Sequence, residues 1–148
     1  MDDHAAALAG AIEAALPSWV ERSVARLMTA WKGDVDAGTR DAAVAAGRQA
    51  AADVGPQVRE LLAADIDDQR TTPLSLLRGA VRYPTAVLHA AGVPPVQRDE
   101  QQERLFPDDV YDLAPATFAD VDPSLADVGM AWGASKAFEH LQRHKVKK

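Results

Sequence analysis

The chain has 148 residues, a formal net charge of −6 at pH 7 and no cysteine. That length fits one domain, residues 1–148, and the missing cysteine excludes disulfides, thiolate nucleophiles and cysteine-ligated metal centres. The residues before Pro17 lack the basic region of a signal peptide, and the longest run without Asp, Glu, Lys or Arg, residues 83–97, contains three prolines. We therefore expect a cytoplasmic protein that does not cross a membrane.

Two helical arms account for the first part of the chain and predict a helical hairpin over residues 1–66. The apolar residues of the first arm recur at spacings of three and four, as on one side of a helix; they are Leu8, Ile12, Leu16, Trp19, Val20, Val24, Leu27, Met28 and Trp31. Pro17 interrupts this series, and Ser18 and Glu21 after it have the spacing of a capping box. We expect a break or a strong kink at Pro17.

The second arm covers about residues 36–64. Small residues occupy the first half of its apolar side, which favours a close approach to the neighbouring helix. Gly55 and Pro56 predict a second kink or a restart. Because a short turn at Gly33 and Asp34 joins the two arms, antiparallel packing is the economical arrangement.

The second part of the chain, residues 71–144, predicts further helices around an acidic loop. Pro73 suits the first position of a helix, which Pro84 should bend and which should end at Gly92. A short helix is expected to begin at Asp99, where Gln102 completes a capping pair.

The last helix is predicted from Asp122 to about Arg143. Gly129, Gly133 and Ala137 lie four residues apart and form a smooth strip where another helix could approach closely. No segment alternates with a period of two, so we expect little or no sheet. The predicted fold class is all-α: a kinked helical hairpin packed with two further helices and an ordered acidic loop.

The acidic loop, LFPDDVYDLAPATFADVDPSL (residues 105–125), holds too many large apolar residues for a solvated linker; these are Phe106, Val110, Tyr111, Leu113, Phe118 and Val121. We expect it to pack on the helices, with one helical turn near residues 116–119. Its aspartates should point outward or toward arginines; they are Asp108, Asp109, Asp112, Asp120 and Asp122. The distribution of charge along the chain supports pairing between these aspartates and arginines. Residues 70–98 carry four arginines and no acid, whereas residues 99–127 carry nine acids against Arg104 alone.

Two sets of residues are candidate contacts for a partner protein. Arg78 and Arg82, four apart on one side of a helix, form the first set together with Tyr83. The acidic loop supplies the second set, because loops carry function more often than cores do; its members are Asp108, Asp109, Tyr111 and Asp112. Either set could instead serve the fold, the arginines by pairing with carboxylates and the loop by completing the core.

No motif for catalysis is present, since the sequence has no phosphate-binding glycine loop, nucleophile elbow or calcium loop. We predict no cofactor and have no basis for predicting an enzyme. His140 and His144 have the spacing of two zinc ligands, but the glutamate of a HExxH motif is missing, so no metal site is predicted. A pocket beside the bent third helix could be lined by Tyr83, His89, Tyr111 and Trp132.

Three stretches in the second part of the chain, RYPTAVLHAAGVPP, LFPDDVYDL and GMAWGASKAFEHL, resemble an uncharacterised family of small proteins from high-GC Gram-positive bacteria. The family has no known function. The resemblance therefore implies a bacterial, cytoplasmic setting and no activity, cofactor or site residue.

The sequence predicts a non-catalytic protein-interaction module whose protein partner is unknown, and a homodimer through the alanine- and glycine-lined helix faces is one form of it. The first alternative is a helical small-molecule binder or enzyme that uses the pocket beside the third helix. The second alternative is a nucleic-acid-associated regulator, which would need exposed, unpaired arginines. The acidic overall charge argues against that second alternative.

Overall fold

Helices form the regular structure of residues 2–146, which are the residues that the computed structural model describes; the side chains of Ile66 and residues 143–146 lie outside that description. The elements are α1 (Asp3–Lys32), α2 (Ala37–Ala63), the 3₁₀ turn η1 (Ile66–Asp68), α3 (Pro73–Gly79), α4 (Arg82–Ala90), α5 (Glu100–Leu105), α6 (Phe118–Val121) and α7 (Leu125–Val146). Within this range the chain forms no strand, which confirms the predicted all-α class. No helix in the same range combines the length and the apolar character that a membrane crossing requires.

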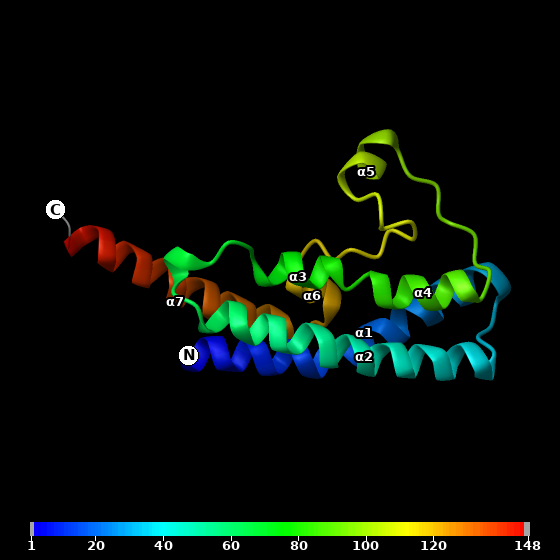
Figure 1. The fold of residues 1–148 in the computed structure, drawn as a ribbon, viewed down its shortest axis with the longest axis horizontal. Helices are drawn as coiled ribbons and strands as arrows, with labels where there is room; N and C mark the ends of the chain where they lie inside the picture. Colours follow the sequence, from blue (N-terminus) through cyan, green and yellow to red (C-terminus); the bar gives the residue numbers. More distant parts are fainter. Residues whose placement is uncertain (1, 147–148) are drawn as a thin grey trace.

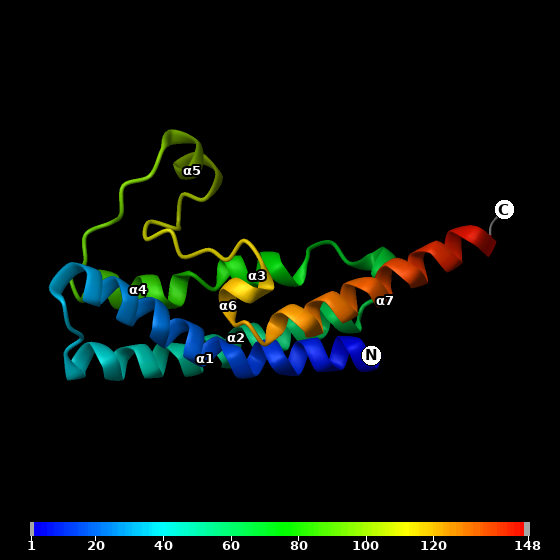
Figure 2. The ribbon, with the colours of Figure 1, turned by 180° about the vertical axis from the view of Figure 1, so that it is seen from behind.

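The two long helices, α1 and α2, form the predicted antiparallel hairpin and run side by side (Figure 1). α4 packs against both of them and α3 packs against α2, so α3 and α4 lie end to end along the hairpin. α7 packs on α1 and on the short α6, toward the end of the hairpin where α1 begins (Figure 2). The apolar core receives side chains from the hairpin, from α3 and α4, from the acidic loop and from α7.

Pro17 lies inside α1 rather than between two helices. Of the two alternatives predicted there, a break or a strong kink, the break does not occur, because α1 continues without interruption through Pro17 and Ser18. Leu16 and Val20, on either side of Pro17, are fully buried. Burial of such side chains contributes about 1.5–3 kcal/mol each, which offsets the roughly 3 kcal/mol that a proline costs inside a helix. The helix accommodates the proline by bending along its length (Figure 2).

The two hairpin helices approach each other closely where Gly47 of α2 meets Pro17 of α1. A Cβ atom on Gly47 would lie 2.8 Å from both the Cα and the carbonyl oxygen of Pro17. A residue without a side chain is therefore required for the two backbones to come this close. An ion pair of 2.8 Å between Glu13 and Arg59 joins the same two helices. Of the kink or restart predicted at Gly55 and Pro56, the restart does not occur, since α2 also continues through its proline.

Pro84 divides the predicted third helix into α3 and α4 instead of bending it. A proline ring clashes with the carbonyl four residues earlier, which here belongs to Ala80, and the chain leaves the helical path at that point. Pro84 then falls in the first turn of α4, where no helical hydrogen bond is lost. The predicted end at Gly92 is confirmed: Gly92 has a φ of 82°, and the Val93 N–H donates to the Leu88 carbonyl at 3.0 Å.

The remaining helices begin close to where the sequence predicts them. Asp99 and Gln102 form the expected capping box at the start of α5. The helical turn expected near residues 116–119 is α6, and α7 extends to Val146, past its predicted end. The ring of Phe118 on α6 fills the space beside Gly129 of α7, where a Cβ atom would lie 2.5 Å from that ring.

Lys136 ties α7 to the start of α1. Its amino group lies 2.5 Å from the Asp2 carboxylate and 3.2 Å from that of Glu139, and only 11% of its side chain is exposed. The hydrogen bond from Lys136 holds the pKa of Asp2 below its ordinary value of 3.8, and the same bond raises the pKa of Lys136 above 10.5. Both shifts stabilise the folded state wherever both groups are charged.

Replacement of Gly47 by alanine is expected to destabilise the protein by about 1–3 kcal/mol, because the new methyl group meets rigid backbone. Gly10→Ala in α1 is the control, since a Cβ atom there meets nothing within 4 Å. That change should raise the free energy of unfolding by about 0.5–1 kcal/mol, because alanine favours a helix over glycine. Urea unfolding of the two variants measures both effects, and changes of the same sign would contradict the close contact.

Lys136→Met should lower the thermal stability at neutral pH, by no more than about 1 kcal/mol for a pair with one exposed partner. The contribution of Asp2 is present above its unfolded pKa and is lost as the pH falls through its lower folded pKa. The contribution of Lys136 is present below its unfolded pKa and is lost as the pH rises through its higher folded pKa. The stability difference between variant and parent should therefore shrink as the pH falls below the ordinary pKa of Asp2, 3.8. A difference that is independent of pH would show that Lys136 acts through packing alone.

Candidate functional site

The acidic loop (residues 105–125) is packed against the helices through its apolar side chains, as the sequence predicts. Tyr111 is 1% exposed, and its hydroxyl donates to the Val93 carbonyl at 2.6 Å, just after α4. Leu113 and Val121 are also buried in the core. Tyr111 is therefore a core residue, and the prediction that it contacts a partner at the surface is corrected.

Asp109 closes the tightest turn of this loop from the inside. Only 4% of the residue is exposed, and its carboxylate accepts hydrogen bonds from the Leu113 N–H at 2.7 Å and the Ala114 N–H at 2.9 Å. Asp112, between them, takes the left-handed backbone conformation with a φ of 54°. The prediction that Asp109 points outward or toward an arginine is therefore wrong, because its carboxylate is buried and accepts from the main chain. Aspartate side chains commonly accept hydrogen bonds from backbone N–H groups a few residues ahead in the sequence. That preference could have indicated from the sequence that Asp109 stabilises a turn.

Arginines hold the acidic loop through its backbone carbonyls. Arg78 Nε donates to the Pro115 carbonyl at 3.0 Å, and Arg98 Nη1 donates to the Phe106 carbonyl at 2.7 Å. Arg22 Nη2 donates to the Val121 carbonyl at 2.5 Å and lies 3.7 Å from the Asp122 carboxylate. The basic and acidic segments therefore meet as predicted, but these hydrogen bonds go to the main chain rather than to carboxylates.

Tyr83 turns away from the acidic loop and joins α4 to α2. Its hydroxyl donates to the Asp53 carboxylate at 2.7 Å and accepts from Arg82 Nη2 at 2.8 Å, and the Arg82 guanidinium lies 4.9 Å from the centre of the ring. The hydrogen bond from Tyr83 lowers the pKa of Asp53, and burial raises the pKa of Tyr83. Tyr83 thus orients Arg82 instead of offering its own ring to a partner.

A groove of about 460 Å³ separates the acidic loop from the junction of α3 and α4. We call it the arginine groove; it is lined by Arg78, Gly79, Val81, Arg82, Leu105, Phe106, Pro107, Asp108, Asp109 and Ala114. Leu105 is 62% exposed and Phe106 is 42% exposed, so the groove has an apolar rim. It brings together four of the predicted contact residues, Arg78, Arg82, Asp108 and Asp109, while Tyr83, Tyr111 and Asp112 lie outside its wall.

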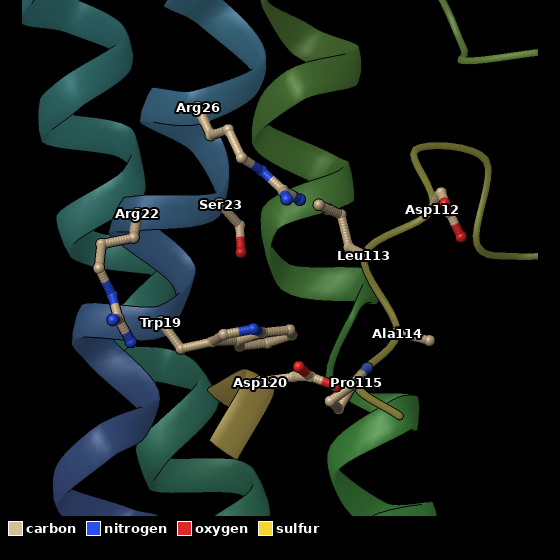
Figure 3. A pocket seen from close by; sticks show the side chains of 9 residues that line it. All are labelled: Trp19, Arg22, Ser23, Arg26, Asp112, Leu113, Ala114, Pro115 and Asp120. Atoms are coloured by element: carbon tan, nitrogen blue, oxygen red, sulfur yellow. The ribbon is translucent and has the colours of Figure 1, made fainter. Parts of the chain in front are cut away.

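A second cavity, of about 300 Å³, lies on the other side of the acidic loop, against α1 (Figure 3). We call it the tryptophan cavity; it is lined by Trp19, Arg22, Ser23, Arg26, Asp112, Leu113, Ala114, Pro115 and Asp120. In Figure 3 the Trp19 ring lies across one end, and the Ser23 and Arg26 side chains reach toward the cavity from α1. An aromatic face beside a guanidinium group suits a small planar acid, although the volume is at the low end for ligand sites.

The pocket predicted from Tyr83, His89, Tyr111 and Trp132 is not formed. His89 is exposed on α4, whereas Trp132 is partly buried on α7 with its indole N–H lacking a hydrogen-bond partner. α4 and α7 lie toward opposite ends of the long axis of the molecule (Figures 1 and 2). The sequence could not exclude this pocket, because residues on different helices meet only if the packing brings their faces together.

The two histidines considered as zinc ligands are only partly described. His140 Nδ1 lies 3.9 Å from the Asp67 carboxylate, and the side chain of His144 lies outside the described residues. Among the side chains that are described, no cluster of three or more metal-ligating residues occurs. The absence of a metal site stays a prediction.

Asp109→Ala should destabilise the protein by about 1–3 kcal/mol, because two buried N–H groups lose their acceptor. Amide exchange at Leu113 and Ala114 should accelerate as the turn opens. Asp108→Ala is the matched control, since the neighbouring aspartate is exposed and should change the stability by less than about 0.5 kcal/mol. Equal effects of the two substitutions would show that the hydrogen bonds accepted by Asp109 do not stabilise the turn.

Comparison with known proteins does not assign the chain to a family. No protein-family model, curated protein or solved structure matches the chain. The resemblance to small proteins of high-GC Gram-positive bacteria therefore stays a prediction, and the functional argument depends on the geometry of the loop and its two flanking spaces.

Proposed function

We propose that the chain is a non-catalytic protein-interaction module that binds an acidic, partly apolar segment of a partner protein in the arginine groove. The observation that supports this most directly is the composition of the groove's walls. Arg78 and Arg82 stand on the helical side, and Leu105 and Phe106 stand exposed on the loop side. Arginine and aromatic side chains are enriched at the centres of protein interfaces, and exposed apolar surface beside them adds to the area that a partner can bury.

The charges of the groove favour a partner segment with a carboxylate near Arg82. Arg82 is exposed, and its guanidinium is held in place by the Tyr83 hydroxyl and ring. The Asp109 carboxylate on the opposite wall is occupied by two backbone N–H groups, so it competes little for the guanidinium. A preoriented arginine loses less conformational entropy on binding than a mobile one.

The apolar rim favours a second anchor next to that carboxylate. Leu105 and Phe106 leave much of their surface in water, and a large side chain of the partner would cover both. Together, the two anchors require a short segment in which an acid and a large apolar residue are near neighbours. Such a segment fits a groove more readily than a flat surface.

Two other functions are supported less well. A small-molecule binder remains the first alternative, with the tryptophan cavity in place of the predicted pocket. For a nucleic-acid regulator, the arginines at the loop would have to be available to phosphates. Arg22, Arg78 and Arg98 each donate to a backbone carbonyl, which weighs against that use.

Selection from a displayed library of random peptides of about 12 residues tests the proposed function. We expect enriched peptides to pair acidic with large apolar residues and to shift the amide NMR signals of Gly79, Val81 and Phe106. Shifts confined to Trp19 and Ser23 would identify the tryptophan cavity as the site instead. Enrichment of basic peptides, or of none, would contradict the proposal.

Substitutions in the groove test the same site by affinity. Arg82→Glu and Leu105→Ser should each weaken binding of a selected peptide at least about tenfold, since each removes one anchor. Arg48→Glu is the matched charge control, because Arg48 is exposed on α2 and lies outside the groove. Thermal unfolding of each variant separates loss of binding from loss of fold.

A further inference from the structure

Ser23 of α1 is a buried residue whose hydroxyl has no hydrogen-bond partner among the described residues. Apart from tyrosine and tryptophan, two residues with polar side chains are buried in that part of the chain, Ser23 at 6% exposure and Asp109 at 4%. Asp109 accepts two hydrogen bonds from the main chain, so Ser23 is the one whose polar group the fold leaves unused. Buried hydroxyl groups are ordinarily hydrogen-bonded, and an unpaired one indicates a position where another molecule can supply the partner.

The Ser23 hydroxyl opens into the tryptophan cavity. Two polar side-chain atoms of the described residues are completely enclosed and unpaired, Thr85 Oγ1 and Trp132 Nε1, and Ser23 Oγ is not one of them. The Ser23 oxygen therefore stays accessible from the cavity that the residue lines. In Figure 3 this oxygen points from α1 toward the Trp19 ring.

Arg26 brings a positive charge to the same cavity. Its side chain is exposed and forms no hydrogen bond or ion pair with any residue that the structure describes. Arg22, the other arginine in the wall, is engaged, because its Nη2 donates to the Val121 carbonyl and lies 3.7 Å from the Asp122 carboxylate. Ser23 and Arg26 are three residues apart on α1, so the unused hydroxyl and the unused guanidinium lie on the same side of the helix.

The two carboxylates in the wall of the cavity oppose a bound anion only weakly. The Asp120 carboxylate accepts hydrogen bonds from the Ala116 and Thr117 N–H groups, each at 2.9 Å. The Asp112 carboxylate is directed away from the Trp19 ring in Figure 3. The charge nearest the Ser23 hydroxyl is therefore the positive charge of the Arg26 guanidinium, which favours an anionic ligand.

The Trp19 ring gives the cavity a flat apolar wall beside these two donors. Trp19 is 5% exposed, so packing holds its ring in one orientation. Figure 3 shows the ring nearly edge-on, with Ser23 and Leu113 on the same side of its plane. Aromatic groups stack favourably on such a face. The volume of about 300 Å³ lies at the low end for ligand sites and suits a molecule of one or two rings.

We propose that the tryptophan cavity binds a small aromatic carboxylate, with its ring on the Trp19 face and its carboxylate between the Ser23 hydroxyl and the Arg26 guanidinium. A guanidinium group can donate two parallel hydrogen bonds to a carboxylate, and the serine hydroxyl gains the acceptor that the fold does not supply. A phosphate has no flat apolar part and would leave the Trp19 face unused. This small-molecule site is additional to the peptide site in the arginine groove and does not depend on it.

Titration with benzoate, followed by NMR, tests the ligand class. We expect the indole N–H signal of Trp19 and the amide signals of Ser23 and Leu113 to shift and to saturate. Benzamide has the same shape without the charge and should bind at least about tenfold more weakly. Cyclohexanecarboxylate keeps the charge without the flat ring and should also bind more weakly than benzoate. Shifts that do not saturate, equal binding of benzamide, or shifts confined to Gly79 and Phe106 of the arginine groove would overturn the proposal.

Substitutions test the two donors by affinity. Arg26→Gln should weaken benzoate binding at least about tenfold, and Ser23→Ala should weaken it about threefold to tenfold, while thermal unfolding shows that both variants stay folded. Arg48→Gln is the matched control, because Arg48 is exposed on α2 and lines neither the cavity nor the groove. Binding that is unchanged by Arg26→Gln, or weakened as much by Arg48→Gln, would overturn the proposal. The peptide selection reports on the arginine groove independently, so this proposal and the proposed function can fail separately.

Discussion

The contact between Gly47 and Pro17 determines how the rest of the molecule is assembled. It brings the backbones of α1 and α2 together at a position where any side chain on α2 would collide with α1. The hairpin in turn provides the surface on which α3, α4 and α7 pack. The proline of α1 therefore lies at a close contact between the two helices, and the glycine opposite it makes that contact possible.

The acidic loop is ordered although most of its carboxylates are not paired with basic side chains. The apolar side chains of the loop pack in the core, and the buried Asp109 carboxylate accepts a hydrogen bond from the Leu113 N–H group in the turn. Arg78 and Arg98 each donate a hydrogen bond to a backbone carbonyl of the loop. Asp108 and Asp112 remain exposed. The loop is thus fixed by main-chain hydrogen bonds, and the groove and the cavity beside it have defined walls.

Much of the fold could be predicted from the sequence, because helical spacing and end signals are local. The stop at Gly92 and the capping box at Asp99 are cases in which neighbouring residues determine the outcome. Neither Pro17 nor Pro56 interrupts its helix, so the break and the restart that were among the predicted alternatives do not occur, because burial across the hairpin outweighs a local penalty. The site was predicted only in part for the same reason: the arginines and aspartates were identified, but whether an aspartate such as Asp109 faces water depends on packing between distant segments.

One backbone segment of the acidic loop forms a partition between two spaces. Ala114 lines both the arginine groove and the tryptophan cavity, so the loop at this residue borders both spaces. A displacement of that segment toward α1 would enlarge the groove at the expense of the cavity, and the reverse displacement would do the opposite. Occupancy of either space would consequently be linked to that of the other, with equal effect in both directions.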